Sequence, residues 1–187
     1  LRLARMKAGS LDLESPDVKI LVNAKGEPDR ILQMENDESH QLIEEFMLLA
    51  NQTVAKKLRQ RKIPGIFRVH PEPDPENLDE LRNFLAIFGI SCGELTSRKE
   101  VNKMLRAINK HPLAQVLRIK FLRSMKQACY RKTPDGHYGL AMRDYLHFTS
   151  PIRRMSDCVC HYLLKFIYLR KEKKLKLQVL QPILFLL

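Results

Sequence analysis

The order of apolar and polar residues along this 187-residue chain predicts short strands first and helices later. Asp17–Val22 and Asp29–Leu32 flank the turn-forming tetrapeptide Asn-Ala-Lys-Gly, which predicts a β-hairpin. Apolar residues spaced by three to five then predict a helix from Ser39, its expected N-cap, to Leu58, and this helix should be largely buried. A short strand is predicted over Ile66–His70, because the proline-rich stretch that follows cannot continue regular structure.

The second half of the chain is predicted to be mostly helical. Amphipathic spacing predicts three helices, over Glu76–Phe88, Ser97–Asn109 and Leu113–Cys129. Tyr138–Phe148 contains β-favouring aromatic residues, and Ser150 followed by Pro151 is a typical start for a last helix. The predicted class is therefore α+β: a hairpin and short strands packed with about five helices, in one domain or part of one.

Charge is spread unevenly and favours a polyanionic partner. The chain has 33 Lys and Arg against 21 Asp and Glu, a net charge of +12. Residues 101–187 carry 18 basic and 4 acidic side chains, and residues 51–70 carry 6 basic and none acidic, whereas the two other stretches are net acidic. Such a basic half favours nucleic acid first and an anionic membrane surface second.

Several classes of protein are disfavoured. No apolar run reaches the ~18–20 residues that span a bilayer, so we expect no membrane association. The four cysteines show neither zinc spacing nor a disulfide framework, which indicates reduced thiols in an intracellular, cytoplasmic protein. The first residues lack an initiator methionine and a signal-peptide layout, which suggests a piece of something longer.

The densest chemical signal lies around two consecutive arginines. Arg153 and Arg154 are expected in the first turn of the last helix, where cations oppose the helix dipole at some cost in stability. Two guanidinium groups and the free N–H groups of a first turn would together form an anion site suited to phosphate. Spacing alone leaves a second interpretation open, in which one arginine only pairs with Asp157 or a neighbouring loop.

The surrounding sequence resembles a known family. The run HYGL at residues 137–140, with YLHFTSPIRRMSD at residues 145–157, resembles the signature of the RNB catalytic domain of RNase II and RNase R exoribonucleases. Other segments resemble the family in the same order, namely Gly9–Leu13, the hairpin, Leu42–Asn51 and Phe67–Pro71. We therefore expect a partial RNB domain over residues 1–170 and a basic, then apolar tail of uncertain origin over residues 171–187.

The resemblance implies an activity and roles for individual residues. Family members hydrolyse single-stranded RNA from the 3′ end to nucleoside 5′-monophosphates, using two Mg²⁺ ions. Arg153 matches the family's catalytic arginine, whose planar charged group can bind oxygens of the scissile phosphate. Glu44 matches a residue that positions the terminal nucleotide; the alternative for Glu44 is an ion pair with a neighbouring cation. The remaining RNA-binding candidates are Arg154, Tyr138, His147 and Ser150, with Asp157 in support.

The chain also departs from the family. Leu13 stands where RNase II has a phenylalanine that stacks on the last base, and leucine lacks the required π face. The family's magnesium ligands are clustered aspartates that precede the region matched here, so no metal ligand is predicted in this chain. His70, His137 and His147 are expected to be packed or hydrogen-bonded rather than metal ligands. The chain alone should hydrolyse little or no RNA and should need the remainder of the RNB domain.

Two other functions stay open on the sequence. A non-catalytic RNA-binding module would use the basic second half to bind phosphates, with an affinity that falls steeply with salt. A protein-interaction piece would instead use the apolar residues 177–187 and would self-associate independently of salt.

Overall fold

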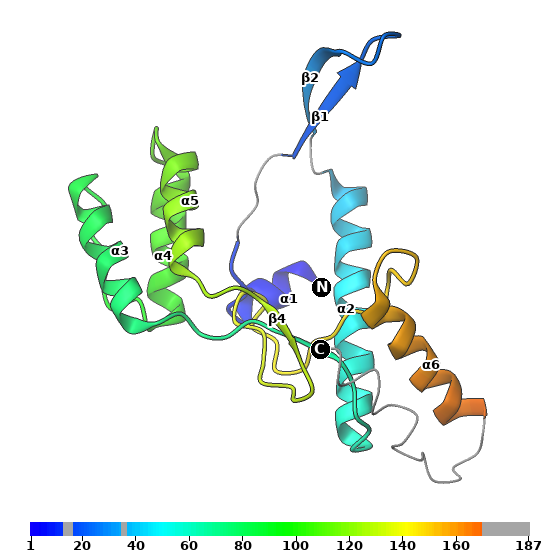
Figure 1. Cartoon of the computed structure of the whole chain (residues 1–187). Coiled ribbons are helices and arrows are strands. Elements are labelled where there is room, and N and C mark those ends of the chain that lie inside the picture. The colour runs from blue at the N-terminus through cyan, green and yellow to red at the C-terminus, as the bar shows by residue number, and fades with distance from the viewer. Residues whose placement is uncertain (13–16, 35–36, 170–187) are drawn as a thin grey trace.

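The computed structural model describes residues 1–12, 17–34 and 37–169, and within them the chain is α+β, as predicted. These residues form six helices and two separate two-stranded antiparallel sheets. In chain order (Figure 1) the elements are α1 (Arg2–Lys7), β1 (Asp17–Val22), β2 (Pro28–Met34), α2 (Glu38–Gln60), β3 (Phe67–Val69), α3 (Pro75–Ile87), α4 (Arg98–Asn109), α5 (Ala114–Ser124), β4 (Cys129–Arg131) and α6 (Met155–Leu169). The helix that was not predicted is α1, which at six residues is too short to show a helical period.

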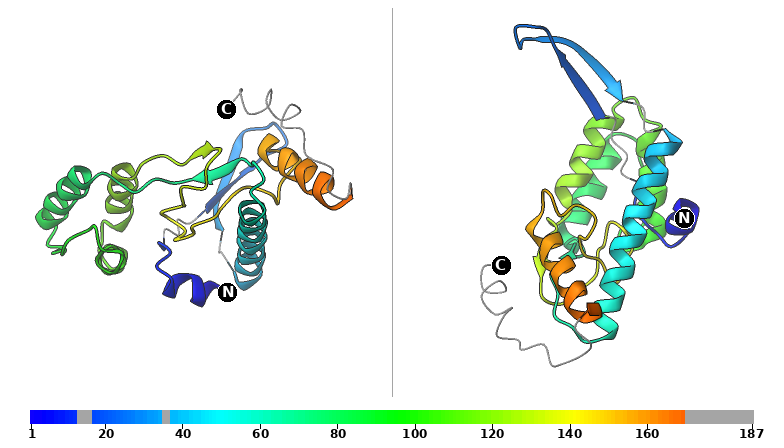
Figure 2. Two further views of the ribbon diagram at one scale, coloured as in Figure 1. Left: turned by 90° about the horizontal axis from the view of Figure 1, so that it is seen from below. Right: turned by 90° about the vertical axis from the view of Figure 1, so that its right-hand side faces the viewer.

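The predicted hairpin is confirmed. β1 and β2 pair antiparallel with Ile20 opposite Ile31. Asn23 makes the turn, because its side-chain oxygen accepts hydrogen bonds from the backbone N–H groups of Lys25 (2.9 Å) and Glu27 (3.0 Å). The hairpin projects beyond the N-terminal end of α2 (Figures 1 and 2).

The long helix α2 is confirmed, but its cap is not the predicted one. Asp37, not Ser39, occupies the N-cap and accepts a hydrogen bond from the backbone N–H of His40 (2.9 Å). The hydroxyl of Ser39 instead donates to the Asp37 carboxylate (2.6 Å). The hydrogen bond from Ser39, helped by those from His40, holds the pKa of Asp37 well below its ordinary value, so the cap stays charged.

The expectation that this helix is largely buried is wrong for its N-terminal half. Leu42, Phe46 and Leu49 are 53%, 53% and 41% exposed. The described part of the chain packs mainly on the other side of α2, where Leu58 and Ala55 are fully buried. The helix therefore carries apolar side chains on two sides, of which one is covered.

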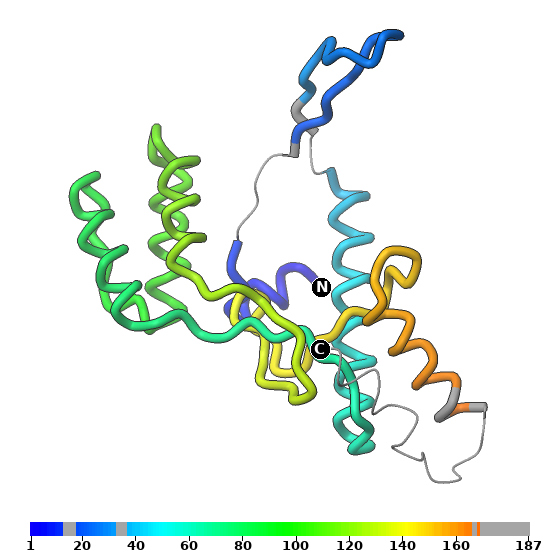
Figure 3. The backbone as a smooth tube through the Cα atoms, viewed as in Figure 1, coloured from blue at the N-terminus to red at the C-terminus, as the bar shows by residue number. Residues whose placement is uncertain are grey.

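The apolar core consists of two main clusters in different parts of the molecule. One joins the C-terminal half of α2 to β3 and α6 through Leu58, Phe67 and Leu163. The other is formed mainly by α3, α4 and α5, with Leu85 and Phe121 fully buried in it. Figures 2 and 3 show these three helices standing together, apart from α2 and α6.

The helix predicted over residues 113–129 ends earlier than expected. α5 stops at Ser124, whose hydroxyl donates to the carbonyl of Phe121 (2.7 Å). Cys129–Arg131 form β4 and pair antiparallel with β3. This pairing with a segment far away in sequence satisfies backbone groups outside a helix, and helical periodicity cannot reveal it.

The strand expected over Tyr138–Phe148 is replaced by turns and single bridges. Gly136, just before it, has a φ of 90°, and Ala141 within it has a φ of 53°. Backbone in this left-handed region cannot continue an extended strand. Isolated bridges remain, including one between Phe67 and Leu146 that holds the segment against β3.

Candidate functional site

The two arginines of the signature lie just before α6, not in its first turn. Residues 151–153 form a turn, and the carbonyl of Ser150 accepts hydrogen bonds from the backbone N–H groups of Arg153 (3.3 Å) and Arg154 (3.2 Å). The carbonyl of Arg154 then accepts hydrogen bonds from the backbone N–H groups of Asp157 (3.2 Å) and Cys158 (3.4 Å), with which α6 begins. The backbone N–H groups of Arg153 and Arg154 are therefore not free to bind an anion, because the Ser150 carbonyl already accepts from both.

Asp157 is the buried centre of this turn. Its carboxylate is fully inaccessible to solvent and accepts hydrogen bonds from the backbone N–H of Ser150 (2.8 Å), the guanidinium of Arg154 (2.9 Å) and the hydroxyl of Ser156 (3.0 Å). Burial pushes the pKa of Asp157 up, but these hydrogen bonds and the charge of Arg154 together bring it below its ordinary value. Asp157 therefore stays ionised and ties the end of the turn to α6.

Arg153 differs from its neighbour in having a free side chain. It is exposed, and its guanidinium makes no hydrogen bond or ion pair with the part of the chain that the structure describes. The backbone beneath it is fixed by the Ser150 carbonyl and by the thiol of Cys158, which donates to the Pro151 carbonyl (3.0 Å). A free cation on a fixed turn can bind an anion without first breaking an ion pair.

A pocket of about 440 Å³ lies beside this turn and brings distant candidates together. Glu44 of α2 and Arg154 both line it, although they are far apart in sequence. Glu44 is exposed and has no ion-pair partner among the described residues. Its neighbour Glu45 is buried, and one of its carboxylate oxygens accepts a hydrogen bond from the Nε of Arg5 (2.9 Å). The remaining lining residues are Ser39, His40, Ile43, Met47, Leu48, Asn51 and Tyr145.

Asn51 and Tyr145 are functional candidates that sequence reasoning missed. Asn51 is buried; its side-chain amide donates to the Tyr145 hydroxyl (3.2 Å), and its side-chain oxygen accepts from the backbone N–H of Phe148 (2.9 Å). These bonds fix the segment before the arginine turn against α2. The sequence signal that could have indicated Asn51 is its amide side chain among the apolar positions of α2, because a buried amide requires hydrogen-bond partners.

Three predicted RNA-binding residues, Tyr138, His147 and Ser150, do not line this pocket. Tyr138 is buried beneath the guanidinium of Arg98, which lies 4.4 Å from the ring centroid, and it lines a second pocket of about 280 Å³. The ring Nδ1 of His147 lies 2.8 Å from the Tyr130 hydroxyl. Burial, with a smaller contribution from nearby Arg154, lowers the pKa of His147 to about 4, so this ring is neutral at pH 7. Ser150 acts through its backbone: its N–H donates to the carboxylate of Asp157, and its carbonyl accepts from the N–H groups of Arg153 and Arg154.

The three histidines singled out from the sequence are packed and hydrogen-bonded. The Nδ1 of His70 accepts from the backbone N–H of Gly139 (3.1 Å), and its ring meets that of His137 edge-on at 5.1 Å. Burial lowers the pKa of His137 to about 4. Over residues 1–12, 17–34 and 37–169 no three His, Cys, Asp or Glu side chains are placed to hold a metal ion. None of the helices in these ranges is long and apolar enough to cross a bilayer.

Comparison with known proteins identifies the class. The RNB domain matches residues 1–170. Ribonuclease R of Thermotoga maritima is 41% identical over 175 residues, which are 92% of this chain and 24% of that protein. Ribonuclease R of Escherichia coli K12 is 36% identical over 171 residues, which are 90% of this chain and 21% of that protein. The chain belongs to the RNB-domain family of ribonuclease R, and it spans about a fifth to a quarter of the length of these relatives.

Solved structures agree with this assignment. Mycoplasma genitalium RNase R in complex with double-stranded RNA matches with a TM-score of 0.88 and 28% identity, over 98% of this chain and 34% of that chain. Yeast Ssd1, described as a pseudonuclease, matches with a TM-score of 0.64 and 26% identity, over 81% of this chain and 19% of that chain. Leu13 and residues 171–187 lie outside the described residues, so what was predicted for them stays a prediction.

Proposed function

We propose that this chain is part of a 3′-to-5′ exoribonuclease that hydrolyses single-stranded RNA to nucleoside 5′-monophosphates, with Arg153 at the scissile phosphate. The observation that carries the proposal is the free guanidinium of Arg153 on a turn fixed by buried Asp157. This turn belongs to the segment that resembles the family signature, and it adjoins the pocket lined by Glu44 and Arg154.

Each side chain has a distinct task in this proposal. Arg153 binds phosphate oxygens and offsets the negative charge that develops on them during hydrolysis. Arg154 is partly neutralised by Asp157, so it lines the pocket and holds the turn rather than binding a phosphate strongly. Glu44 is free to accept hydrogen bonds from the hydroxyl groups of a terminal ribose.

The residues described here do not fit a magnesium site. Mg²⁺ prefers oxygen ligands in octahedral geometry, commonly including carboxylates, and the described residues contain no suitable cluster. We assign the magnesium ligands to the remainder of the RNB domain and derive no step from the metal in this chain.

The first test measures hydrolysis by the chain alone. Incubation with 5′-labelled single-stranded RNA and Mg²⁺ should release little or no mononucleotide, because the metal ligands are supplied elsewhere. Rapid mononucleotide release would show that the chain holds a complete catalytic site, contrary to the proposal.

The second test separates chemistry from binding. In a complete catalytic domain that includes this chain, Arg153→Ala should lower kcat by about 100-fold or more while RNA affinity falls far less, since the arginine acts mainly on charge in the transition state. Arg82→Ala, which removes an exposed cation on α3 that pairs with Asp79 (3.1 Å), is the matched control. Equal losses of kcat and affinity on Arg153→Ala would mean that Arg153 only binds RNA.

A second candidate function is a non-catalytic RNA-binding module. The similarity to yeast Ssd1, a pseudonuclease, favours it, because that protein matches at 26% identity. Under this alternative, Arg153→Ala would weaken RNA binding in a complete domain that shows no hydrolysis.

A further inference from the structure

The turn that carries Arg153 is joined to the sheet of β3 and β4 by a row of polar side chains. Asp157, the buried anchor of the turn, accepts a hydrogen bond from the hydroxyl of Ser156 (3.0 Å), which is itself buried. The hydroxyl oxygens of Ser156 and Tyr130 lie 3.4 Å apart. The Tyr130 hydroxyl in turn lies 2.8 Å from the ring Nδ1 of His147. Side chains from three separate segments are therefore connected in series.

The hydrogen bonds of this row have one consistent direction. An ionised carboxylate only accepts, so the single proton of the Ser156 hydroxyl belongs to the bond with Asp157. The Tyr130 hydroxyl is then the donor to Ser156, and it accepts from His147. Burial lowers the pKa of His147 to about 4, so the ring carries one proton at pH 7. The row is complete when that proton is on Nδ1.

The other end of the row is held by backbone pairing. Tyr130 of β4 lies opposite Arg68 of β3, whose guanidinium is 4.8 Å from the centroid of the Tyr130 ring. The backbone N–H of Arg68 donates to the carbonyl of Tyr145 (3.0 Å), a residue that lines the pocket. The same two strands therefore hold both the pocket wall and, through Tyr130, the turn that carries Arg153.

We propose that Tyr130 is a positioning residue for Arg153, to which it is connected by a directed series of hydrogen bonds. This series, the Tyr130 network, runs from His147 through Tyr130 and Ser156 to Asp157. Its task rests on the proposed function, in which Arg153 acts at the scissile phosphate. Its course and direction rest on the contacts alone.

The Tyr130 network reaches Arg153 through the backbone of the turn. The carboxylate of Asp157 also accepts from the backbone N–H of Ser150 (2.8 Å), and the Ser150 carbonyl accepts from the backbone N–H of Arg153 (3.3 Å). A shift of Asp157 therefore moves the base of the Arg153 side chain. A misplacement of about 1 Å can lower a reaction rate by about 100-fold, so loss of the Tyr130 hydroxyl should affect the reaction more than RNA binding.

The first measurement tests the Tyr130 network without RNA or metal. Nitrogen NMR of the isotope-labelled chain at pH 7 should show the imidazole proton of His147 on Nδ1. A proton on Nε2 overturns the proposal, because Tyr130 would then donate to His147 and not to Ser156.

The second measurement is a double-mutant cycle in a complete catalytic domain that includes this chain. Tyr130→Phe removes one hydroxyl and keeps the ring, so kcat should fall about three- to tenfold, the worth of one neutral hydrogen bond, with KM little changed. Beside Arg153→Ala, the same substitution should change kcat by less than about twofold, because Tyr130 acts through Arg153.

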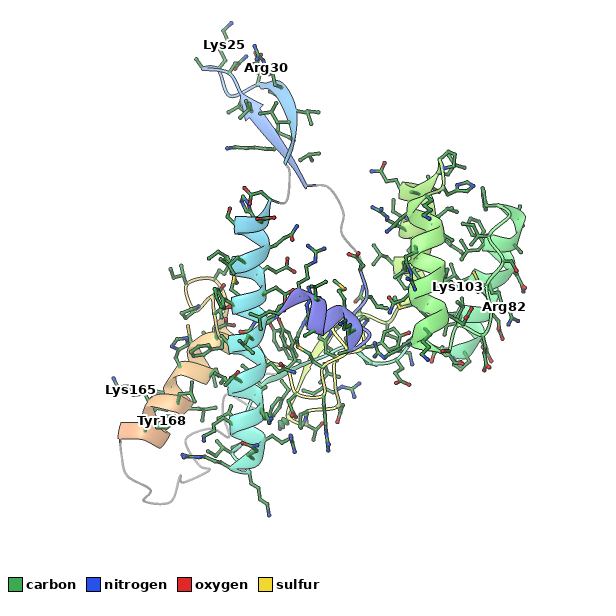
Figure 4. All side chains as sticks on the ribbon, turned by 180° about the vertical axis from the view of Figure 1, so that it is seen from behind. Lys25, Arg30, Arg82, Lys103, Lys165 and Tyr168 are labelled. Carbon is green, nitrogen blue, oxygen red and sulfur yellow. The ribbon has the colours of Figure 1, made fainter. Side chains whose placement is uncertain are left out.

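Tyr168→Phe is the matched control, since it also removes the hydroxyl of a tyrosine beside an arginine. The guanidinium of Arg61 lies 5.4 Å from the centroid of the Tyr168 ring, and Tyr168 is more than half exposed. Its hydroxyl makes no hydrogen bond within the part of the chain that the structure describes. Figure 4 shows Tyr168 at the end of α6 that lies away from the arginine turn. This substitution should leave kcat unchanged.

The outcomes separate this proposal from the proposed function. If Arg153→Ala itself leaves kcat unchanged, the proposed function fails and the positioning role fails with it. If Arg153→Ala lowers kcat but Tyr130→Phe does not, or lowers it equally in both backgrounds, the positioning role alone is overturned. Should Tyr130→Phe prevent folding of the complete domain, Ser156→Ala interrupts the same network at the next residue, and the same cycle with it decides the question.

Discussion

Arg153 and Arg154 are adjacent in the chain, but their guanidinium groups have different surroundings. Arg154 is mostly buried and paired with Asp157 (2.9 Å), whereas Arg153 is exposed and unpaired among the described residues. The sequence left open whether an arginine binds phosphate or only forms an ion pair. The structure divides these roles, because the buried carboxylate of Asp157 binds the guanidinium of Arg154, while the exposed guanidinium of Arg153 has no partner among the described residues.

At this scale, Asp157→Asn should destabilise the protein. Asparagine removes the negative charge that pairs with the partly buried Arg154 guanidinium, so the free energy of unfolding should fall by about 1–3 kcal/mol. Urea unfolding of the chain measures this change. Asp135→Asn is the matched control, since Asp135 pairs with Arg131 (3.0 Å) at the exposed surface and should cost about 0.5 kcal/mol or less. Equal effects of the two substitutions would contradict a central role for Asp157.

At the scale of elements, a line of aromatic and imidazole rings holds the irregular segment after β4 in place. The ring of Tyr145 meets those of His137 (5.2 Å) and His147 (5.8 Å), and His137 in turn meets His70. Cations surround this line, because Arg68 lies over the Tyr130 ring and Arg154 lies near His147. Protonation of these rings would therefore be unfavourable in the folded state.

We expect the protein to lose stability as the pH falls from about 6.5 to 4. The folded pKa values of His137 and His147 are about 4, below the ordinary value of 6.5, so in this window the unfolded state binds more protons. The loss should be on the order of 2 kcal/mol in total, because the rings are only partly buried and solvent screens part of each shift. Below about pH 4, protonation of Asp157, whose pKa is also lowered, should add a further loss.

Thermal unfolding at several pH values measures this dependence. His147→Gln should flatten the curve between pH 6.5 and 4. His111→Gln, in the turn before α5, removes a ring outside this line and should leave the slope unchanged. A stability that is constant over this window would contradict the burial of these rings.

At the scale of the whole molecule, the basic excess of the second half should govern RNA binding. Affinity for a single-stranded oligouridylate should fall about ten- to a hundredfold between 50 and 200 mM salt, because bound cations release counterions from several phosphates. Fluorescence anisotropy measures the logarithmic slope, and Arg153→Ala should reduce it by about 0.7, the contribution of a single phosphate contact on a single strand. Binding that is insensitive to salt would contradict a phosphate interface.

Much of the architecture was predictable because it depends on local patterns. The hairpin follows from Asn23 and its turn, and α2, α3 and α4 follow from helical spacing. The predictions that were wrong for β4 and for residues 138–148 share a different cause. β4 replaces the end of a helix, and turns replace the strand over residues 138–148, because pairing with β3 and the left-handed backbone at Ala141 outweigh local propensity.

The sequence by itself determined the family, the α+β class and the segment in which the candidate chemistry lies, since these depend on residue identity and spacing. Only the tertiary structure decided which arginine is free, that Glu44 and Arg154 share a pocket, and that Asn51 joins the site. These facts depend on contacts between residues far apart in sequence, such as Asn51 and Phe148, whose residue numbers differ by 97. Such contacts leave no periodic signal in a single chain.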